Sequence, residues 1–101
     1  MTMANEYIAT IDKTVEDGQL IVKPTANSPK QEILRYELIS AKQGTSGKSL
    51  TSQSGNVRTK PDQPMILSTL KLGMNDTDHY TITLNVYADN ILVASDKLQY
   101  P

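Results

Sequence analysis

The segment Lys42–Ser49 holds the residues whose types and spacing come nearest to phosphate-binding chemistry. It ends in Gly-Lys-Ser, as does the phosphate-binding loop of many nucleotide-binding proteins. That loop also requires a glycine five residues before the Gly-Lys pair, where this chain has Lys42, and a helix directly after it. Residues 50–55 are Leu-Thr-Ser-Gln-Ser-Gly, which do not favour a helix. The segment therefore predicts a turn between two β-strands, with a basic residue on each side.

Residues that could carry catalysis or bind a metal are few. The chain has no cysteine, which excludes a thiolate nucleophile, a disulfide and a cysteine metal site. His79 is the only histidine, and it forms no evident Ser–His–Asp set. Asp76 and Asp78, beside Asn75, lack the glycine and the closing glutamate of an EF-hand loop, so we interpret them as turn formers. We expect no catalytic residue, no metal, no cofactor and no enzymatic activity.

The formal net charge is −1, but the charges are unevenly distributed. Between Lys23 and Lys71 there are eight basic and three acidic residues. Gathered on one face, these basic residues would attract acidic partners, whereas on alternate strand positions they would be ordinary solvated side chains; both interpretations remain open. Nucleic acid is not expected as a partner, because the isoelectric point is acidic and basic and aromatic residues do not alternate. No apolar run approaches the roughly 18 residues that would predict membrane insertion.

Apolar residues recur with a period of two, which is typical of half-buried β-strands. The clearest case is Tyr80–Tyr87, in which tyrosine, isoleucine, leucine and valine alternate with threonine and asparagine. We expect one domain over residues 1–101, an all-β, seven-stranded immunoglobulin-like β-sandwich, with residues 1–4 disordered or belonging to an added start. The predicted strands are Glu6–Ile11, Gln19–Pro24, Ile33–Lys42, Lys48–Gln53, Pro64–Leu72, Tyr80–Tyr87 and Ile91–Leu98.

Three connecting segments add local expectations. Ala88–Asn90 is short enough for a hairpin. The polar segment Gly44–Asp62 is expected to form a mobile rim, with Lys48–Gln53 as an edge strand. Tyr80 follows Asp76-Thr77-Asp78-His79, a placement that fits either the tyrosine corner of immunoglobulin-like domains or an ordinary buried tyrosine at the start of a strand.

Three segments together resemble a known family: Leu34–Ser40, Lys42–Ser49 and Asp62–Leu72. From Gln31 onward the chain is similar to the CsgC-like curli assembly inhibitors, closest to the CsgH branch, and the basic-x-Gly-[Ser/Thr]-Ser-Gly turn is the most distinctive part. The resemblance implies a periplasmic, seven-stranded immunoglobulin-like sandwich. It also implies a function, which is to keep the curli major subunit, a CsgA-like client in its unfolded or early aggregating form, from forming amyloid. We expect a monomer in its mature form, without a signal peptide.

The chain departs from CsgC at a Cys-x-Cys pair on the third strand of that protein, whose positions match Glu32 and Leu34 here. Any family function must therefore be non-covalent. The candidate client-binding residues surround the glycine-rich turn or carry the nearby basic charges: Arg35, Lys42, Gly44, Ser46, Gly47, Lys48, Arg58 and Lys60. The alternative is an immunoglobulin-like adhesion or assembly module, which would form a stable, saturable complex with a folded protein partner.

Overall fold

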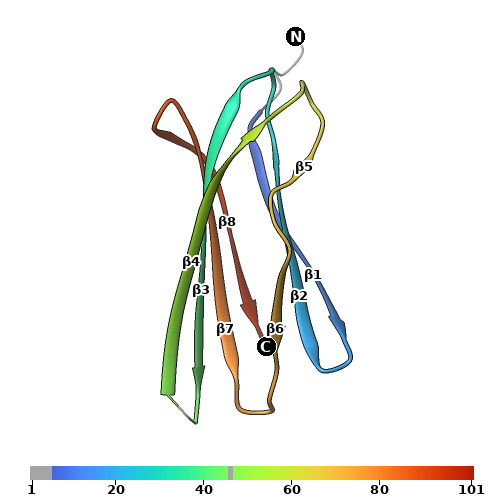
Figure 1. The fold of residues 1–101 in the computed structure, drawn as a ribbon, viewed down its shortest axis with the longest axis vertical. Helices are drawn as coiled ribbons and strands as arrows, with labels where there is room; N and C mark the ends of the chain where they lie inside the picture. Colours follow the sequence, from blue (N-terminus) through green and yellow to red (C-terminus); the bar gives the residue numbers. More distant parts are fainter. Residues whose placement is uncertain (1–5, 46) are drawn as a thin grey trace.

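The protein is described by a computed structural model covering residues 6–45 and 47–101. Two antiparallel sheets face each other, and every regular element among these residues is a β-strand (Figure 1). The strands are β1 Ile8–Glu16, β2 Gln19–Asn27, β3 Ile33–Gly44, β4 Gly47–Arg58, β5 Met65–Ile66, β6 Leu70–Gly73, β7 His79–Ala88 and β8 Ile91–Tyr100. Residues 1–4, expected to lie outside the fold, are not among the described residues.

The hairpin β1–β2 lies in one sheet, and the hairpins β3–β4 and β7–β8 lie in the other. One sheet has the order β1-β2-β5, with β6 also paired to β2, and the other has the order β4-β3-β7-β8. Asp17 and Gly18 join β1 to β2 with φ of 50° and 74°. Asp89 and Asn90 join β7 to β8 with φ of 50° and 63°, so the predicted hairpin is confirmed. Positive φ at both turn residues matches the right-handed twist of the flanking strands.

The described residues form eight strands rather than the predicted seven, because the expected strand Pro64–Leu72 is divided into β5 and β6. The division lies opposite Pro24 of β2, between the pairs Thr25–Ile66 and Val22–Leu70. Proline has no N–H to donate to a neighbouring strand. The Pro24 carbonyl still accepts a bond of 2.9 Å from Leu67 N–H, but the regular ladder is interrupted there.

The core lies between the sheets and is built from every second residue along the strands, where the side chains point inward. β2, β3 and β7 contribute most of it, because each has neighbours on both sides. β7 shows strict alternation of buried and partly buried residues from Tyr80 to Ala88, as the sequence pattern predicted. The buried apolar residues are Ile11, Leu20, Val22, Ala26, Leu34, Leu38, Tyr80, Ile82, Leu84, Val86 and Ala88.

β4 is longer than the expected edge strand Lys48–Gln53 and pairs with β3 over its whole length of 12 residues. Most of the polar segment that was expected to form a mobile rim is therefore a regular strand. It does lie at a sheet edge, as expected. Apolar burial contributes little to this strand, since most of its side chains are exposed. Its place in the sheet is set by backbone pairing to the well-anchored β3.

Candidate functional site

The hairpin β3–β4 contains all the predicted client-binding residues that the structure describes, except Lys60. Its register runs without a shift from Ile33–Arg58 to Gly44–Gly47. Gly47 has φ of 116°, a conformation that favours glycine at the turn. Ser46 lies outside the described residues. Figure 1 shows this turn at one end of the molecule, together with the β1–β2 turn and the β6–β7 connection.

The predicted basic residues lie on different faces of this hairpin. Lys42 is opposite the buried Tyr80 and therefore lies on the inner face, whereas Lys48 pairs with Gln43 and lies on the outer face. Arg35 is also on the outer face, where its guanidinium stacks 4.1 Å from the centre of the Tyr87 ring. Both ends of the hairpin therefore carry positive charge, but the side chains of Lys42 and Lys48 leave it on opposite faces.

Arg58 and Lys60 lie at the opposite end from the turn, since Arg58 pairs with Ile33 at the start of β3 and Lys60 follows β4. Lys48 and Arg58 are ten residues apart on one strand. At roughly 3.3 Å per residue, their Cα atoms are about 33 Å apart. Both side chains are exposed and lie on the outer face. These residues therefore bracket β4 with charge instead of forming one compact basic cluster.

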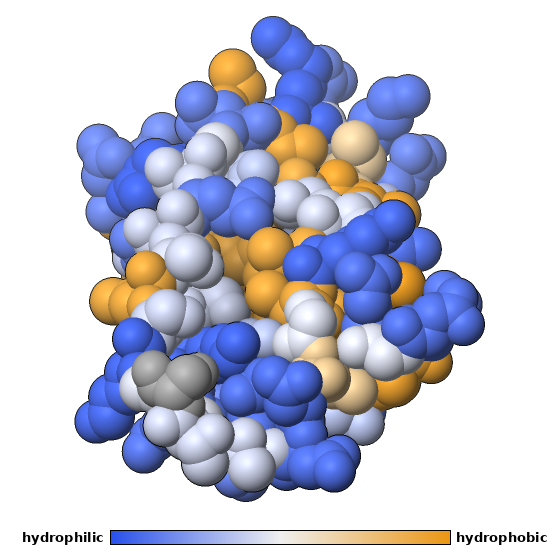
Figure 2. Space-filling model, turned by 60° about the horizontal axis from the view of Figure 1, so that its bottom comes forward, coloured by the Kyte–Doolittle hydropathy of each residue, from blue (hydrophilic) through white to orange (hydrophobic). Residues whose placement is uncertain are grey.

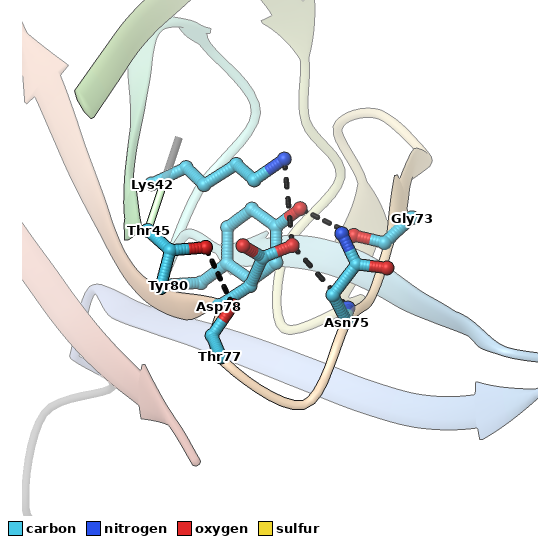
Figure 3. A network of polar contacts seen from close by, with 7 residues as sticks. All are labelled: Lys42, Thr45, Gly73, Asn75, Thr77, Asp78 and Tyr80. Carbon is cyan, nitrogen blue, oxygen red and sulfur yellow. Dashed lines mark hydrogen bonds and ion pairs between the residues drawn. The ribbon is translucent and has the colours of Figure 1, made fainter. Parts of the chain in front are cut away.

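Lys42 belongs to a polar network beneath the turn (Figure 3). Its Nζ lies 3.4 Å from Oδ2 of Asp78, a carboxylate that is only 3% exposed. The same oxygen accepts a bond of 3.3 Å from the Asn75 backbone N–H. The charge of Lys42 is thus opposed by a buried partner from the β6–β7 connection. Lys42 therefore serves the fold and contributes less than Lys48 to the outward positive field.

Gly44 lies against the Asp78 carboxylate, and this proximity explains the absence of a side chain. A Cβ built on Gly44 would collide with Asp78 Oδ1. Nearby, the hydroxyls of Thr45 and Thr77 lie 3.4 Å apart and connect the β3–β4 turn to the β6–β7 connection. The glycine that appeared in sequence as part of a turn motif is needed for packing against a buried carboxylate.

Tyr80 forms the hydrogen bond expected of a tyrosine corner. Its phenol, at the start of β7, donates to the carbonyl of Gly73 at the end of β6. A bond from this position back to upstream backbone is characteristic of immunoglobulin-like sandwiches. Of the two interpretations of Tyr80 that the sequence left open, the hydrogen bond favours the corner.

The free edge of β4 is the most unusual feature of the hairpin. No described strand pairs with β4 on the side away from β3. The inner-face side chains Ser49, Thr51 and Gln53 are exposed, and a bond of 2.8 Å from Ser68 Oγ to Gln53 Oε1 connects β4 to the segment between β5 and β6. The other side of the sandwich is closed, because β1 packs beside β8 and Asp96 accepts a 2.9 Å bond from the N–H of Ile11.

The outer face near Lys48 has a shallow hollow of about 300 Å³. Its lining includes the small Ala41 and Leu50, which is 71% exposed. His79 also lines the hollow, but within residues 6–45 and 47–101 no group of three His, Cys, Asp or Glu side chains is placed to bind a metal. Figure 2 shows this end of the molecule, where hydrophilic side chains predominate and hydrophobic groups appear in the middle, at the right and in smaller patches at the left edge and the top of the view.

Glu32, which the family resemblance pairs with a CsgC cysteine, is held in a hydrogen-bond network just before β3. Its Oε2 accepts bonds from the Tyr7 hydroxyl at 2.8 Å and from Ser28 Oγ at 2.6 Å. Its backbone N–H donates to Thr59 Oγ1 at 3.1 Å. The hydrogen bond to Glu32 is the main cause of the raised pKa of Tyr7. Burial and the negative charges of Glu32 and Asp89 raise this pKa further. This network could not be predicted from local sequence patterns, since Tyr7, Glu32 and Thr59 are far apart in the sequence.

No helix in the described part of the chain is long and apolar enough to cross a membrane. Comparison with protein-family models found no match, and neither did a search of curated proteins. Solved structures do match. The curli protein CsgC of E. coli superposes with a TM-score of 0.78 at 24% identity, covering 95% of this chain and 99% of that chain.

CsgH of R. palustris superposes with a TM-score of 0.71 at 17% identity, covering 88% of this chain and 89% of that chain. A β-glucuronidase from glycoside hydrolase family 2 also matches, with a TM-score of 0.51 at 10% identity, but only 11% of that chain is covered. The match to part of a large enzyme concerns the sandwich alone. The resemblance predicted from the sequence is confirmed at the level of the fold: the chain folds like the curli proteins CsgC and CsgH.

Proposed function

We propose that this chain is a single immunoglobulin-like domain that acts in the periplasm and non-covalently inhibits amyloid formation by a curli major subunit. The observation that carries the proposal is the structural likeness to CsgC, which extends over 95% of this chain and 99% of that one. The likeness to CsgH supports it over most of both chains. The Tyr80 corner bond supports the immunoglobulin-like assignment.

A non-covalent mechanism follows from the side chains of this protein. The chain has no cysteine. At the position matched to a CsgC cysteine, the Glu32 carboxylate is already engaged by Tyr7 and Ser28. A carboxylate held by two hydroxyl groups supports the connection between β1, β2 and β3 and has no redox chemistry. Inhibition must therefore use surface charge, backbone groups and shape.

Amyloid grows when the exposed edge of one strand templates another, so a folded protein that covers such edges can delay nucleation. The hairpin β3–β4 offers the groups for this role. The charges of Lys48 and Arg58 are exposed and can steer a client with acidic groups, with Arg35 and Lys60 as further contributors. Gly44 and Gly47 shape the turn, and Lys42 stabilises it through Asp78. The client would be the curli major subunit before it becomes ordered.

The decisive experiment follows thioflavin fluorescence of a freshly desalted curli major subunit, with this protein present at a small fraction of the subunit concentration. We expect a longer lag. The variant Lys48→Glu/Arg58→Glu should shorten that lag at low salt, and the difference should shrink at high salt because exposed charges are screened. A matched control is Lys23→Glu/Lys71→Glu, which makes the same change in net charge on exposed residues of the other sheet.

An unchanged growth curve, with the protein confirmed to be folded by circular dichroism, would refute the inhibitor function. The alternative module would then be tested by sedimentation with candidate folded partners, where it predicts a stable and saturable complex. If the control variant loses as much activity as Lys48→Glu/Arg58→Glu, net charge is responsible and the basic ends of β4 are not.

A further inference from the structure

We infer that the free edge of β4 binds an extended polypeptide segment, uncharged and polar in its middle and bearing two carboxylates ten residues apart, as an added antiparallel strand. The identification of that segment with part of a curli subunit rests on the proposed function, but the binding site itself is argued from the edge. β-Strand addition of this kind draws its affinity from backbone hydrogen bonds and its selectivity from alternate side chains.

The register of the hairpin identifies the backbone groups that are available. Glu32 and Thr59 lie one position beyond the pair Ile33–Arg58 and keep the same register. The Thr59 N–H donates to the Glu32 carbonyl at 2.8 Å, so this is a hydrogen-bonded position. Antiparallel pairs alternate between hydrogen-bonded and non-hydrogen-bonded, so Ile33–Arg58 and every second pair after it are non-hydrogen-bonded. The residues of β4 that direct N–H and C=O away from β3 are therefore Lys48, Leu50, Ser52, Ser54, Asn56 and Arg58.

These six residues form an uninterrupted and accessible row. All are exposed, and β4 contains neither a proline nor a shift of register that would obstruct a neighbour. Edge strands are commonly protected by bulges, prolines or a covering segment. Among the described residues, β4 has only its basic ends as protection. The contact from Ser68 to Gln53 lies on the inner face and leaves the outward row open.

The charges select the kind of occupant and argue against a second copy of this chain. Two copies of this chain could pair their β4 strands antiparallel about a two-fold axis. The register that uses all six outward residues of each copy places residue 48 of one copy opposite residue 58 of the other. It thus places Lys48 opposite Arg58 at both ends, and like charges directly opposite each other destabilise a sheet. A foreign strand with a carboxylate opposite Lys48 and another opposite Arg58 would gain attraction at both ends.

The side chains between the basic ends define the middle of the occupant. The outward residues are Leu50, Ser52, Ser54 and Asn56, three of which are small or medium-sized and uncharged polar. No acidic residue occurs in β4. Opposite them, Ser, Thr, Asn and Gln side chains can form cross-strand hydrogen bonds. A strongly apolar segment would instead leave its side chains in water, because no layer covers the outer face of β4.

The first test uses a synthetic 13-residue peptide with Asp at positions 2 and 12 and uncharged Ser, Thr, Asn and Gln between them. Backbone amide exchange of the isotope-labelled native protein is measured by NMR with and without this peptide. We expect the amides of Ser52, Ser54 and the other outward residues to exchange rapidly in the free protein and at least tenfold more slowly when the peptide is bound. Exchange at Thr51 and Gln53, whose N–H groups bond to β3, should change little.

The second test removes a donor from the free edge. Ser52→Pro deletes an N–H that points away from β3 and leaves the β3–β4 bonds in place, as proline at a sheet edge permits. It should bind the peptide at least tenfold more weakly than the matched control Ser52→Ala, which keeps the N–H. If Ser52→Pro fails to fold, the exchange measurement on the native protein still decides the matter. A peptide with Lys at positions 2 and 12 should bind much more weakly than the Asp peptide.

Two results would overturn the inference. One is protection by the peptide at residues other than the outward row, for example around the hollow at Ala41. The other is equal affinity of Ser52→Pro and Ser52→Ala. The proposed function is tested separately. If the peptide protects the β4 edge from exchange but the protein leaves the lag of curli assembly unaltered, the inhibitor function alone is refuted. Normal inhibition by folded Ser52→Pro, without edge protection by peptide or subunit, would refute the edge site alone.

Discussion

The contact between Gly44 and Asp78 makes a sharp prediction about stability, tested by Gly44→Ala. The new Cβ would collide with Asp78 Oδ1, and the carboxylate has little room to move away. It is 3% exposed, lies 3.4 Å from Lys42 Nζ and accepts a bond from the Asn75 backbone. Relief of the collision would have to displace a buried charge from its partners.

The expected magnitude follows from two opposing effects. Forcing an extra methyl group into a packed site costs about 1–3 kcal/mol, and partial loss of the Asp78 contacts belongs to this cost. Alanine is intrinsically better than glycine within a strand by roughly 0.5–1 kcal/mol. We expect a net loss of about 1–2 kcal/mol. For a domain of this size, each 1 kcal/mol lowers Tm by roughly 4–8 °C.

The assay is urea unfolding followed by far-ultraviolet circular dichroism, since the chain contains no tryptophan. Gly73→Ala is the matched control, because a Cβ there meets no atom within 4 Å and its φ is not positive. It should be neutral or slightly stabilising. In an Asp78→Ala background the collision is absent, so Gly44→Ala should lose its destabilising effect.

Two outcomes would refute this reasoning. If Gly44→Ala is as stable as the native protein, the Asp78 carboxylate moves without cost and its close packing against Gly44 does not contribute to the free energy of unfolding. If Gly44→Ala destabilises equally in the native and the Asp78→Ala backgrounds, the loss has another origin, such as the backbone of the turn.

Two further predictions concern tyrosine hydroxyls. Tyr80→Phe should destabilise the fold by about 0.5–1.5 kcal/mol, because the buried Tyr80 loses its hydrogen bond to the Gly73 carbonyl. Tyr87→Phe should change the free energy of unfolding by much less. Equal unfolding midpoints in urea for Tyr80→Phe and the native protein would contradict a stabilising corner. The hydrogen bond to Glu32 raises the pKa of Tyr7 above its ordinary value of 10.0, so this bond stabilises the protein fully below about pH 10 and less as the pH rises through the folded pKa. The stability difference between the native protein and Tyr7→Phe should therefore shrink on raising pH from about 9 to 11; a constant difference would contradict this.

Much of the fold could be predicted from local patterns. Alternation in Tyr80–Tyr87 identified the inward residues of β7, and Asp89-Asn90 identified its hairpin. The division into β5 and β6 was missed, because the cause is Pro24 on a neighbouring strand about 40 residues away. The extent of β4 was also missed, since its polar residues give no apolar period and its pairing depends on β3.

The candidate site could be predicted only in part. The sequence drew attention to the glycine-rich turn and to the basic residues around it. The period of two, applied from Leu38 to Lys42, would have placed Lys42 on the inner face, away from Lys48. Its partner Asp78 could not have been found in this way, because Asp78 was identifiable only as a turn former.

The sequence by itself determined the all-β class, the inward residues of the well-anchored strands and the turns, because alternation and turn chemistry act within a few residues. It also excluded thiol chemistry through the absence of cysteine. Only the tertiary structure decided that Asp78 opposes Lys42, that Glu32 binds Tyr7 and Ser28, and that β4 has a free edge bracketed by Lys48 and Arg58. These features depend on strand order and on contacts between distant segments, which no local pattern specifies.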